Sequence, residues 1–201
     1  GYNGSTGPRA CAHFAKREGR ALVIFGTDQL QRREQAYDLL ARGARTHWGL
    51  HPLPPMARGP QGKPYFPGAE DRAFNLSHSG SLALCALDDR PVGVDIQLVG
   101  PHRPGLPARV CAPEELAWLE EEGELWERFA LLWALKECRS KQSGLGLTDT
   151  IARIRVPLPW RLGKEAQLDG LWFRTYAGPG WRAAACGLSL PPEQIFWEKE
   201  L

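Results

Sequence analysis

A carboxylate and an amide lie two residues apart in the segment Pro91–Gln97, which reads PVGVDIQ. Its alternation of apolar and polar residues predicts a strand with Asp95 and Gln97 on one face. Gly93, on the same face, leaves room for another group to approach closely. Hard cations are bound by oxygen ligands on rigid elements, often by one or two carboxylates, so this face is a candidate metal site. The polar outer face of a half-exposed strand explains a single aspartate equally well.

A second set of charged side chains interrupts an apolar helical pattern in residues Glu124–Gly146. The apolar positions repeat with the period of one helical face: Leu125, Phe129, Leu132 and Trp133. The same face continues through Lys136, Glu137, Ser140 and Lys141. Buried charges need a partner, a ligand or water, so this run favours a site in the interior. A surface ion pair between Glu137 and Lys141, four residues apart with the acid first, is the alternative.

Three further residues have side chains suited to holding an anion. Lys63 lies between Gly62 and Pro64 in a turn-rich segment, where it could also be an ordinary solvated lysine. Ser77 and His78 belong to the polar stretch FNLSHSG. Neighbouring residues on an extended chain point to opposite sides, so these two do not form a nucleophilic dyad. A hydrolase elbow of the form GxSxG is also missing from the sequence.

The elements that must position these side chains alternate between strand and helix. A short apolar strand is predicted at 21–26, a helix from Gln29 to about Trp48, and two strands at 82–87 and 91–97. After a proline-rich stretch at 100–107, helices are predicted at 113–121 and 124–146, then strands at 151–156, 170–176, 181–190 and 195–198. The pattern predicts an α+β protein of two similar halves, 21–100 and 101–201. Residues 1–20 are predicted to be a disordered leader or the remnant of an expression tag.

Composition excludes several classes of protein. The 201 residues carry a net charge of only +2, and their basic residues form no long run, so no nucleic-acid partner is expected. No apolar run approaches the roughly 20 residues of a membrane span. The five cysteines are scattered, without a CxxC pair, and are interpreted as buried thiols of a reducing compartment. We therefore expect a cytoplasmic protein with no membrane partner.

The motifs FNLSHSG, VGVDIQ and WALKECRSK, preceded by GKPYFP, resemble one family in both order and spacing. They are similar to the patterns FNxSHS, GxDxE and WxxKExxxK of the 4′-phosphopantetheinyl transferases of the surfactin-synthetase-activating (Sfp) type. The resemblance extends from about Arg32 to Leu201. It implies two α/β halves related by pseudo-twofold symmetry, with coenzyme A in the cleft between them. It also implies transfer of phosphopantetheine to a serine of an acyl or peptidyl carrier protein, with release of adenosine 3′,5′-bisphosphate.

The resemblance assigns a role to each candidate residue. By this resemblance Asp95 and Glu137 are Mg²⁺ ligands, with Mn²⁺ as a substitute metal, and Gln97 stands where many relatives have a glutamate. The residues implied to hold the phosphates of coenzyme A are Arg33, Lys63, Ser77, His78 and Lys141. Glu137, directly or through water, is the candidate base for the serine proton, with Lys141 and Asp95 completing the catalytic set. Two fused halves also predict a monomer.

Two alternatives belong to other functional classes. A homologue that binds coenzyme A or a carrier protein without catalysis would explain the neutral Gln97. A general nucleotide-binding α+β domain would explain the polar cluster without the resemblance. Gain of the phosphopantetheine mass by a carrier protein would support the enzyme, binding without a gain would support the first alternative, and neither outcome would leave the second.

Overall fold

The computed structural model describes residues 21–121, 123–146, 151–158 and 162–200. The predicted leader, residues 1–20, therefore lies outside the described residues, and so does Cys11.

Two four-stranded sheets form the centre of the molecule. The first has the order β10-β1-β5-β4, formed by Phe196–Trp197, Val23–Thr27, Leu82–Asp88 and Ala73–Ser79. The second has the order β6-β9-β8-β7, formed by Val92–Leu98, Trp181–Gly187, Leu171–Gly178 and Glu165–Leu168. A short hairpin joins β2 (Ala57–Arg58) to β3 (Pro64–Tyr65). The α+β class is confirmed, while the pseudo-twofold relation between the halves stays a prediction.

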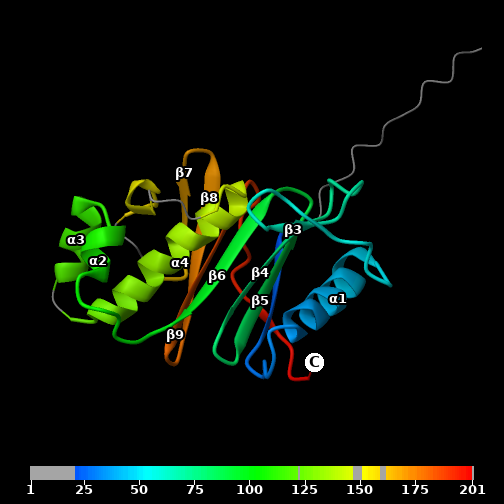
Figure 1. Ribbon diagram of the computed structural model, residues 1–201, viewed down its shortest axis with the longest axis horizontal. Coiled ribbons are helices and arrows are strands. Elements are labelled where there is room, and N and C mark those ends of the chain that lie inside the picture. The colour runs from blue at the N-terminus through cyan, green and yellow to red at the C-terminus, as the bar shows by residue number, and fades with distance from the viewer. Residues whose placement is uncertain (1–20, 122, 147–150, 159–161, 201) are drawn as a thin grey trace, which may run out of the picture.

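The sheets and two helices stack in four layers, in the order α1, first sheet, second sheet and α4 (Figure 1). Helix α1 spans Gln35–Trp48 and α4 spans Leu125–Ser143, while the shorter α2 (Leu106–Val110) and α3 (Pro113–Glu120) lie beside α4. An apolar core fills each space between layers. One buried residue from each core is Leu40, Val94 and Leu135, in the order of the layers. The edge strands β4 and β6 are neighbours, although they belong to different sheets.

Helix α4 lies directly on β6 because Gly93 has no side chain. A Cβ atom on Gly93 would stand 1.8 Å from the carbonyl oxygen of Cys138. The close approach brings the polar face of β6 against the last two turns of α4. The helix then ends at Gly144, whose left-handed φ of 73° is readily adopted by glycine.

Helix α1 begins six residues later than the pattern predicts. The side chain of Gln35 accepts hydrogen bonds from the backbone N–H groups of Gln31 (2.7 Å) and Arg32 (2.9 Å), which hold residues 31–34 in a turn. Arg33 therefore precedes the helix instead of interrupting its buried face. Sequence periodicity could not show this, because Leu30 is also buried and continues the apolar spacing.

The predicted strand at 151–156 is wrong. Residues Ile151–Arg153 form a single 3₁₀ turn, η1. The ammonium of Lys136 accounts for the difference, because it donates to the carbonyls of Ile151 (3.1 Å) and Ala152 (3.4 Å) from within α4. Carbonyls held by a lysine are not free to pair with a neighbouring strand.

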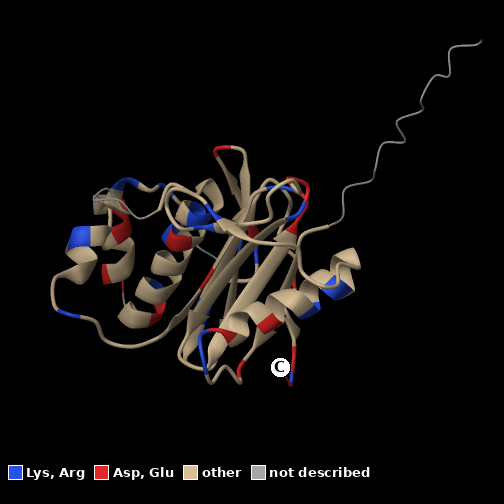
Figure 2. Cartoon of the chain, turned by 45° about the vertical axis from the view of Figure 1, so that its right-hand side comes forward, with Lys and Arg blue, Asp and Glu red and all other residues tan. Residues whose placement is uncertain are grey.

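The burial of the cysteines and the mixture of positive and negative charges on the surface agree with what the composition predicts. Cys85, Cys138 and Cys186 are fully buried, as predicted. Charges of both signs are spread over the two ends of the molecule (Figure 2). Among the helices of the described residues, none combines the length and apolar character needed to cross a membrane.

Candidate active site

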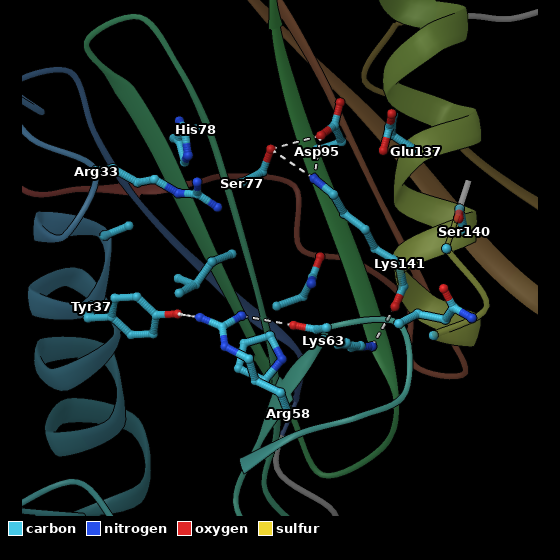
Figure 3. Close-up of a pocket in the computed structure, with 18 of the residues that line it drawn as sticks. Arg33, Tyr37, Arg58, Lys63, Ser77, His78, Asp95, Glu137, Ser140 and Lys141 are labelled. Carbon is cyan, nitrogen blue, oxygen red and sulfur yellow. Dashed lines mark hydrogen bonds and ion pairs between the residues drawn. The ribbon is translucent and has the colours of Figure 1, made fainter. Parts of the chain in front are cut away.

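A single pocket of about 440 Å³ brings together all eight residues selected from the sequence. These residues are Arg33, Lys63, Ser77, His78, Asp95, Gln97, Glu137 and Lys141. They come from β4, β6, α4 and the loops before α1 and β3. Figure 3 shows Arg33 and His78 at one end of the pocket and Asp95 and Glu137 at the other. The end with Arg33 is therefore cationic, whereas the other end holds two carboxylates with the Lys141 ammonium beside Asp95.

Asp95 is the most enclosed carboxylate of the pocket, with 2% of its surface exposed. Its Oδ1 accepts from the Ser77 hydroxyl at 2.8 Å and from the Lys141 ammonium at 2.6 Å. Its Oδ2 accepts from the carboxamide of Gln97 at 2.6 Å. The predicted common face of Asp95 and Gln97 is confirmed, and three donors hold the carboxylate in one orientation.

Glu137 faces Asp95 from α4 (Figure 3). The pKa of Glu137 is raised to about 7, first by burial and then by the negative charge of Asp95, while the positive charge of Lys141 lowers it. A carboxyl group with such a pKa can exchange a proton near neutral pH. Two carboxylates that face each other also favour a cation between them.

The cationic end combines an imidazole with an arginine. The pKa of His78 is lowered, first by burial and then by the positive charges of Arg33 and Lys141. The positive charges of Arg33 and Lys141 thus favour the neutral imidazole, and a bound anion would offset their effect on His78.

The comparisons with known proteins agree with this geometry. Residues 91–186 match the 4′-phosphopantetheinyl transferase superfamily (ACPS). The chain is 37% identical over 143 residues to a 4′-phosphopantetheinyl transferase of Bacillus subtilis, covering 69% of this chain and 58% of that protein. It is 32% identical over 136 residues to 4′-phosphopantetheinyl transferase Sfp of B. subtilis strain 168, covering 62% and 59%.

By the family match, residues 91–186 belong to the 4′-phosphopantetheinyl transferase superfamily. A third relative, the 4′-phosphopantetheinyl transferase AcpT of Salmonella typhi, is 39% identical over 130 residues, covering 61% of this chain and 66% of that protein. The chain thus spans a little under three fifths of the length of the two Bacillus proteins.

The described residues of the pocket offer only two acidic ligands, Asp95 and Glu137, for a divalent cation. Among the described residues, no three His, Cys, Asp or Glu side chains are grouped closely enough to form a metal site by themselves. Mg²⁺ does not need such a group, because it keeps several waters and is commonly bound by one or two carboxylates together with substrate phosphates. Asp95 and Glu137 supply those two carboxylates, and the carboxamide of Gln97 lies beside them.

Lys63 makes different contacts from those expected of a phosphate ligand. Its ammonium donates to the carbonyls of Val92 (3.1 Å), Lys141 (2.5 Å) and Gln142 (3.4 Å). These acceptors include two carbonyls from the last turn of α4, where the helix dipole favours a positive charge. Burial lowers the pKa of Lys63 to about 8. Lys63 therefore ties the loop before β3 to the end of α4.

Sequence reasoning missed Arg58, which also lines the pocket and lies between Tyr37 and Lys63 (Figure 3). Its guanidinium donates to the hydroxyl of Tyr37 (3.2 Å) and to the carbonyl of Gly62 (2.9 Å), and so joins the β2–β3 hairpin to α1. The only signal in the sequence is a single basic residue within a proline-rich stretch. No motif marks Arg58, because its position depends on how that stretch folds back over the helix.

Proposed function

We propose that this chain transfers the 4′-phosphopantetheine group of coenzyme A to a serine hydroxyl of an acyl or peptidyl carrier protein. The match of residues 91–186 to the superfamily supports the reaction, and the pocket supports the substrate. The observation that carries the proposal is the division of one pocket into a cationic end, with Arg33 and His78, and an end with the two carboxylates Asp95 and Glu137. A diphosphate ligand with a further phosphate would match this distribution of charge.

The reaction exchanges one phosphorus–oxygen bond for another. The serine oxygen forms a bond to the phosphorus that carries pantetheine, and the bond from that phosphorus to the bridging oxygen breaks. The bridging oxygen leaves with adenosine 3′,5′-bisphosphate, and the serine proton is released to a base. Negative charge develops on the leaving group, so nearby positive groups stabilise the transition state.

Each end of the pocket has its own task in this proposal. Glu137 accepts the serine proton, directly or through a water molecule. Lys141 faces the phosphates and offsets the charge of the leaving group. His78 and Arg33, together with Arg58, bind the bisphosphate portion of coenzyme A.

Asp95 and Glu137 would hold a magnesium ion, with Gln97 beside it as a weak or water-bridged contact. When bound, the ion would supply Lewis-acid stabilisation of the charge on the diphosphate. In the same proposal the chain acts as a monomer in the cytoplasm.

Mass spectrometry of a carrier protein incubated with the chain, coenzyme A and Mg²⁺ tests the proposal. The carrier should gain the mass of phosphopantetheine, and a carrier whose acceptor serine is replaced by alanine should gain nothing. Acyl and peptidyl carrier proteins tested in parallel decide whether holo-[acyl-carrier-protein] synthase is the appropriate finer name. Binding of coenzyme A without any mass gain would support the non-catalytic alternative and overturn the transferase.

A further inference from the structure

Side chains, not backbone groups, join the two sheets where β4 meets β6. The carboxamide oxygen of Asn75 accepts the N–H of Val94 at 2.8 Å. Two residues farther along each strand, the Ser77 hydroxyl accepts the N–H of Ile96 at 3.2 Å. The third contact of this series joins Ser79 to the N–H of Leu98, also at 3.2 Å. We call these three contacts the β4–β6 seam.

Lysine side chains satisfy carbonyls on β6 close to the seam. Lys63 donates to the carbonyl of Val92 at 3.1 Å, and Lys141 approaches the carbonyl of Val94 at 3.5 Å. A strand edge left without backbone partners must be satisfied in some other way, and here five side chains do so. The polar side chains of β4 thus lie between the backbones of β4 and β6, along the pocket.

The seam holds the backbone on both sides of Asp95. Val94 and Ile96 are its neighbours in the chain, and their N–H groups are bound by Asn75 and Ser77. The same Ser77 hydroxyl donates to Oδ1 of Asp95 at 2.8 Å. One hydroxyl therefore fixes both the backbone and the side chain of this carboxylate. Both Asn75 and Ser77 are about 95% buried, so water cannot readily replace them.

We propose that Asn75 and Ser77 are positioning residues that hold Asp95 in its place for cation binding. The hydroxyl of Ser77 donates to Asp95 and accepts from the Ile96 N–H and, at 3.2 Å, from the Lys141 ammonium. It therefore acts through Asp95 and not as a ligand of the coenzyme's phosphates. The proposal deepens the transferase function and rests on it for the identity of the cation. Outer residues that orient a metal ligand typically contribute about 10–100-fold to metal affinity.

The test compares Ser77→Ala with Ser79→Ala. Both substitutions remove one seam contact of 3.2 Å, but only Ser77 also contacts Asp95 and lines the pocket. Binding of Mn²⁺ is measured by electron paramagnetic resonance, and binding of coenzyme A without metal by calorimetry. Ser77→Ala should weaken Mn²⁺ binding at least about tenfold and change metal-free coenzyme A affinity less than about twofold. Ser79→Ala should change neither.

Two further measurements separate positioning from a general loss of structure. Amide hydrogen exchange should accelerate at Ile96 in Ser77→Ala and at Val94 in Asn75→Ala, with the rest of the second sheet unchanged. Ser77→Thr, which keeps the hydroxyl, should restore most of the Mn²⁺ affinity. Loss of coenzyme A affinity with unchanged Mn²⁺ binding would overturn the proposal and make Ser77 a phosphate ligand. These binding measurements stay decisive even if no carrier protein is modified, so this proposal and the transferase function can fail separately.

Discussion

Helix α4 carries two lysines five residues apart, and each forms an ion pair of almost the same length. The Lys136 ammonium lies 2.7 Å from Glu115, and the Lys141 ammonium lies 2.6 Å from Asp95. The surroundings differ: the side chains of the first pair are 1% and 4% exposed, whereas Lys141 is 28% exposed. Lys136 also donates to two carbonyls of η1, while Lys141 opens into the pocket.

The comparison shows that distance alone does not give an ion pair its role. The enclosed pair is almost completely buried, and it joins α3 and η1 to α4. The pocket pair can exchange its partners, since a cation can take the place of the ammonium beside Asp95 and a phosphate can take the place of the carboxylate beside Lys141. Replacing members of the two pairs in parallel tests this distinction.

The largest expected effect is on catalysis, from loss of a pocket carboxylate. Asp95→Ala and Glu137→Ala should each lower the transfer rate on the order of 10²–10³-fold or more, because the groups that hold the cation are lost. Both variants should still fold, so the rates are compared for the folded enzymes. Glu115→Gln, in the enclosed pair, should lower the unfolding temperature and leave the transfer rate of the folded enzyme unchanged. Chelation by EDTA should abolish transfer, and activity that persists in EDTA contradicts the metal-dependent mechanism.

Stability should respond most to the enclosed pair. Lys136→Met leaves Glu115 buried without its cation, which should lower the free energy of unfolding by about 3–5 kcal/mol in urea titrations. Lys141→Met also leaves a buried carboxylate, Asp95, without its cation, but it should cost less, because the Ser77 hydroxyl and the Gln97 carboxamide still donate to Asp95. The double variant Lys136→Met/Glu115→Leu should recover much of the loss. A loss below about 1 kcal/mol for Lys136→Met would show that the enclosed pair is not structural.

Coenzyme A affinity should depend on the cations of the pocket. His78→Ala and Lys141→Ala should each weaken binding by about 1–3 kcal/mol, the contribution of a charge-assisted hydrogen bond. Lys199→Ala, an exposed lysine outside the pocket, serves as the control. Calorimetric titration measures all three, and dephospho-coenzyme A shows which cation contacts the 3′-phosphate. Unchanged affinity in both pocket variants contradicts the assignment.

The metal-free protein should show the raised pKa of Glu137 directly. Carboxyl ¹³C NMR should give a midpoint of about 7. Lys141→Met should move this midpoint upward, because it removes the charge that lowers it, and Lys136→Met should not. Since the folded state keeps a proton that the unfolded state has lost, stability should fall as pH rises from 4.5 to 7. Glu137→Gln should flatten that fall, and a midpoint near 4.5 would remove the basis for both expectations.

The smallest effect should come from Gln97, the neutral neighbour of Asp95. A carboxylate binds Mg²⁺ more strongly than an amide, so Gln97→Glu should shift half-saturation of transfer to a lower Mg²⁺ concentration. Gln97→Ala should cost far less activity than Asp95→Ala, since it removes only a weak or water-bridged contact. The measurement is the transfer rate against Mg²⁺ concentration. Equal damage from the two alanine variants would make Gln97 an essential direct ligand.

The sequence by itself determined the relations that depend on local geometry. The period of a strand places Asp95 and Gln97 on one face, and the period of a helix places Glu137 and Lys141 one turn apart. Both periods follow from backbone dihedral angles, which neighbouring residues set largely among themselves. The motifs that contain these residues also indicated the family, because their order and spacing can be read from the sequence without knowing how the segments between them fold.

Only the tertiary structure decided which partner each charged group has. Lys63 donates to carbonyls at the end of α4, and Arg58 joins a hairpin to α1; both contacts depend on how loops fold back over distant elements. The resemblance implied that Ser77 is a phosphate ligand like its neighbour His78. Its hydroxyl instead lies between β4 and β6, where it accepts the N–H of Ile96, 19 residues later in the chain. The environment of a side chain depends on all the elements that pack around it, and it forms only when α4 and the two sheets pack together.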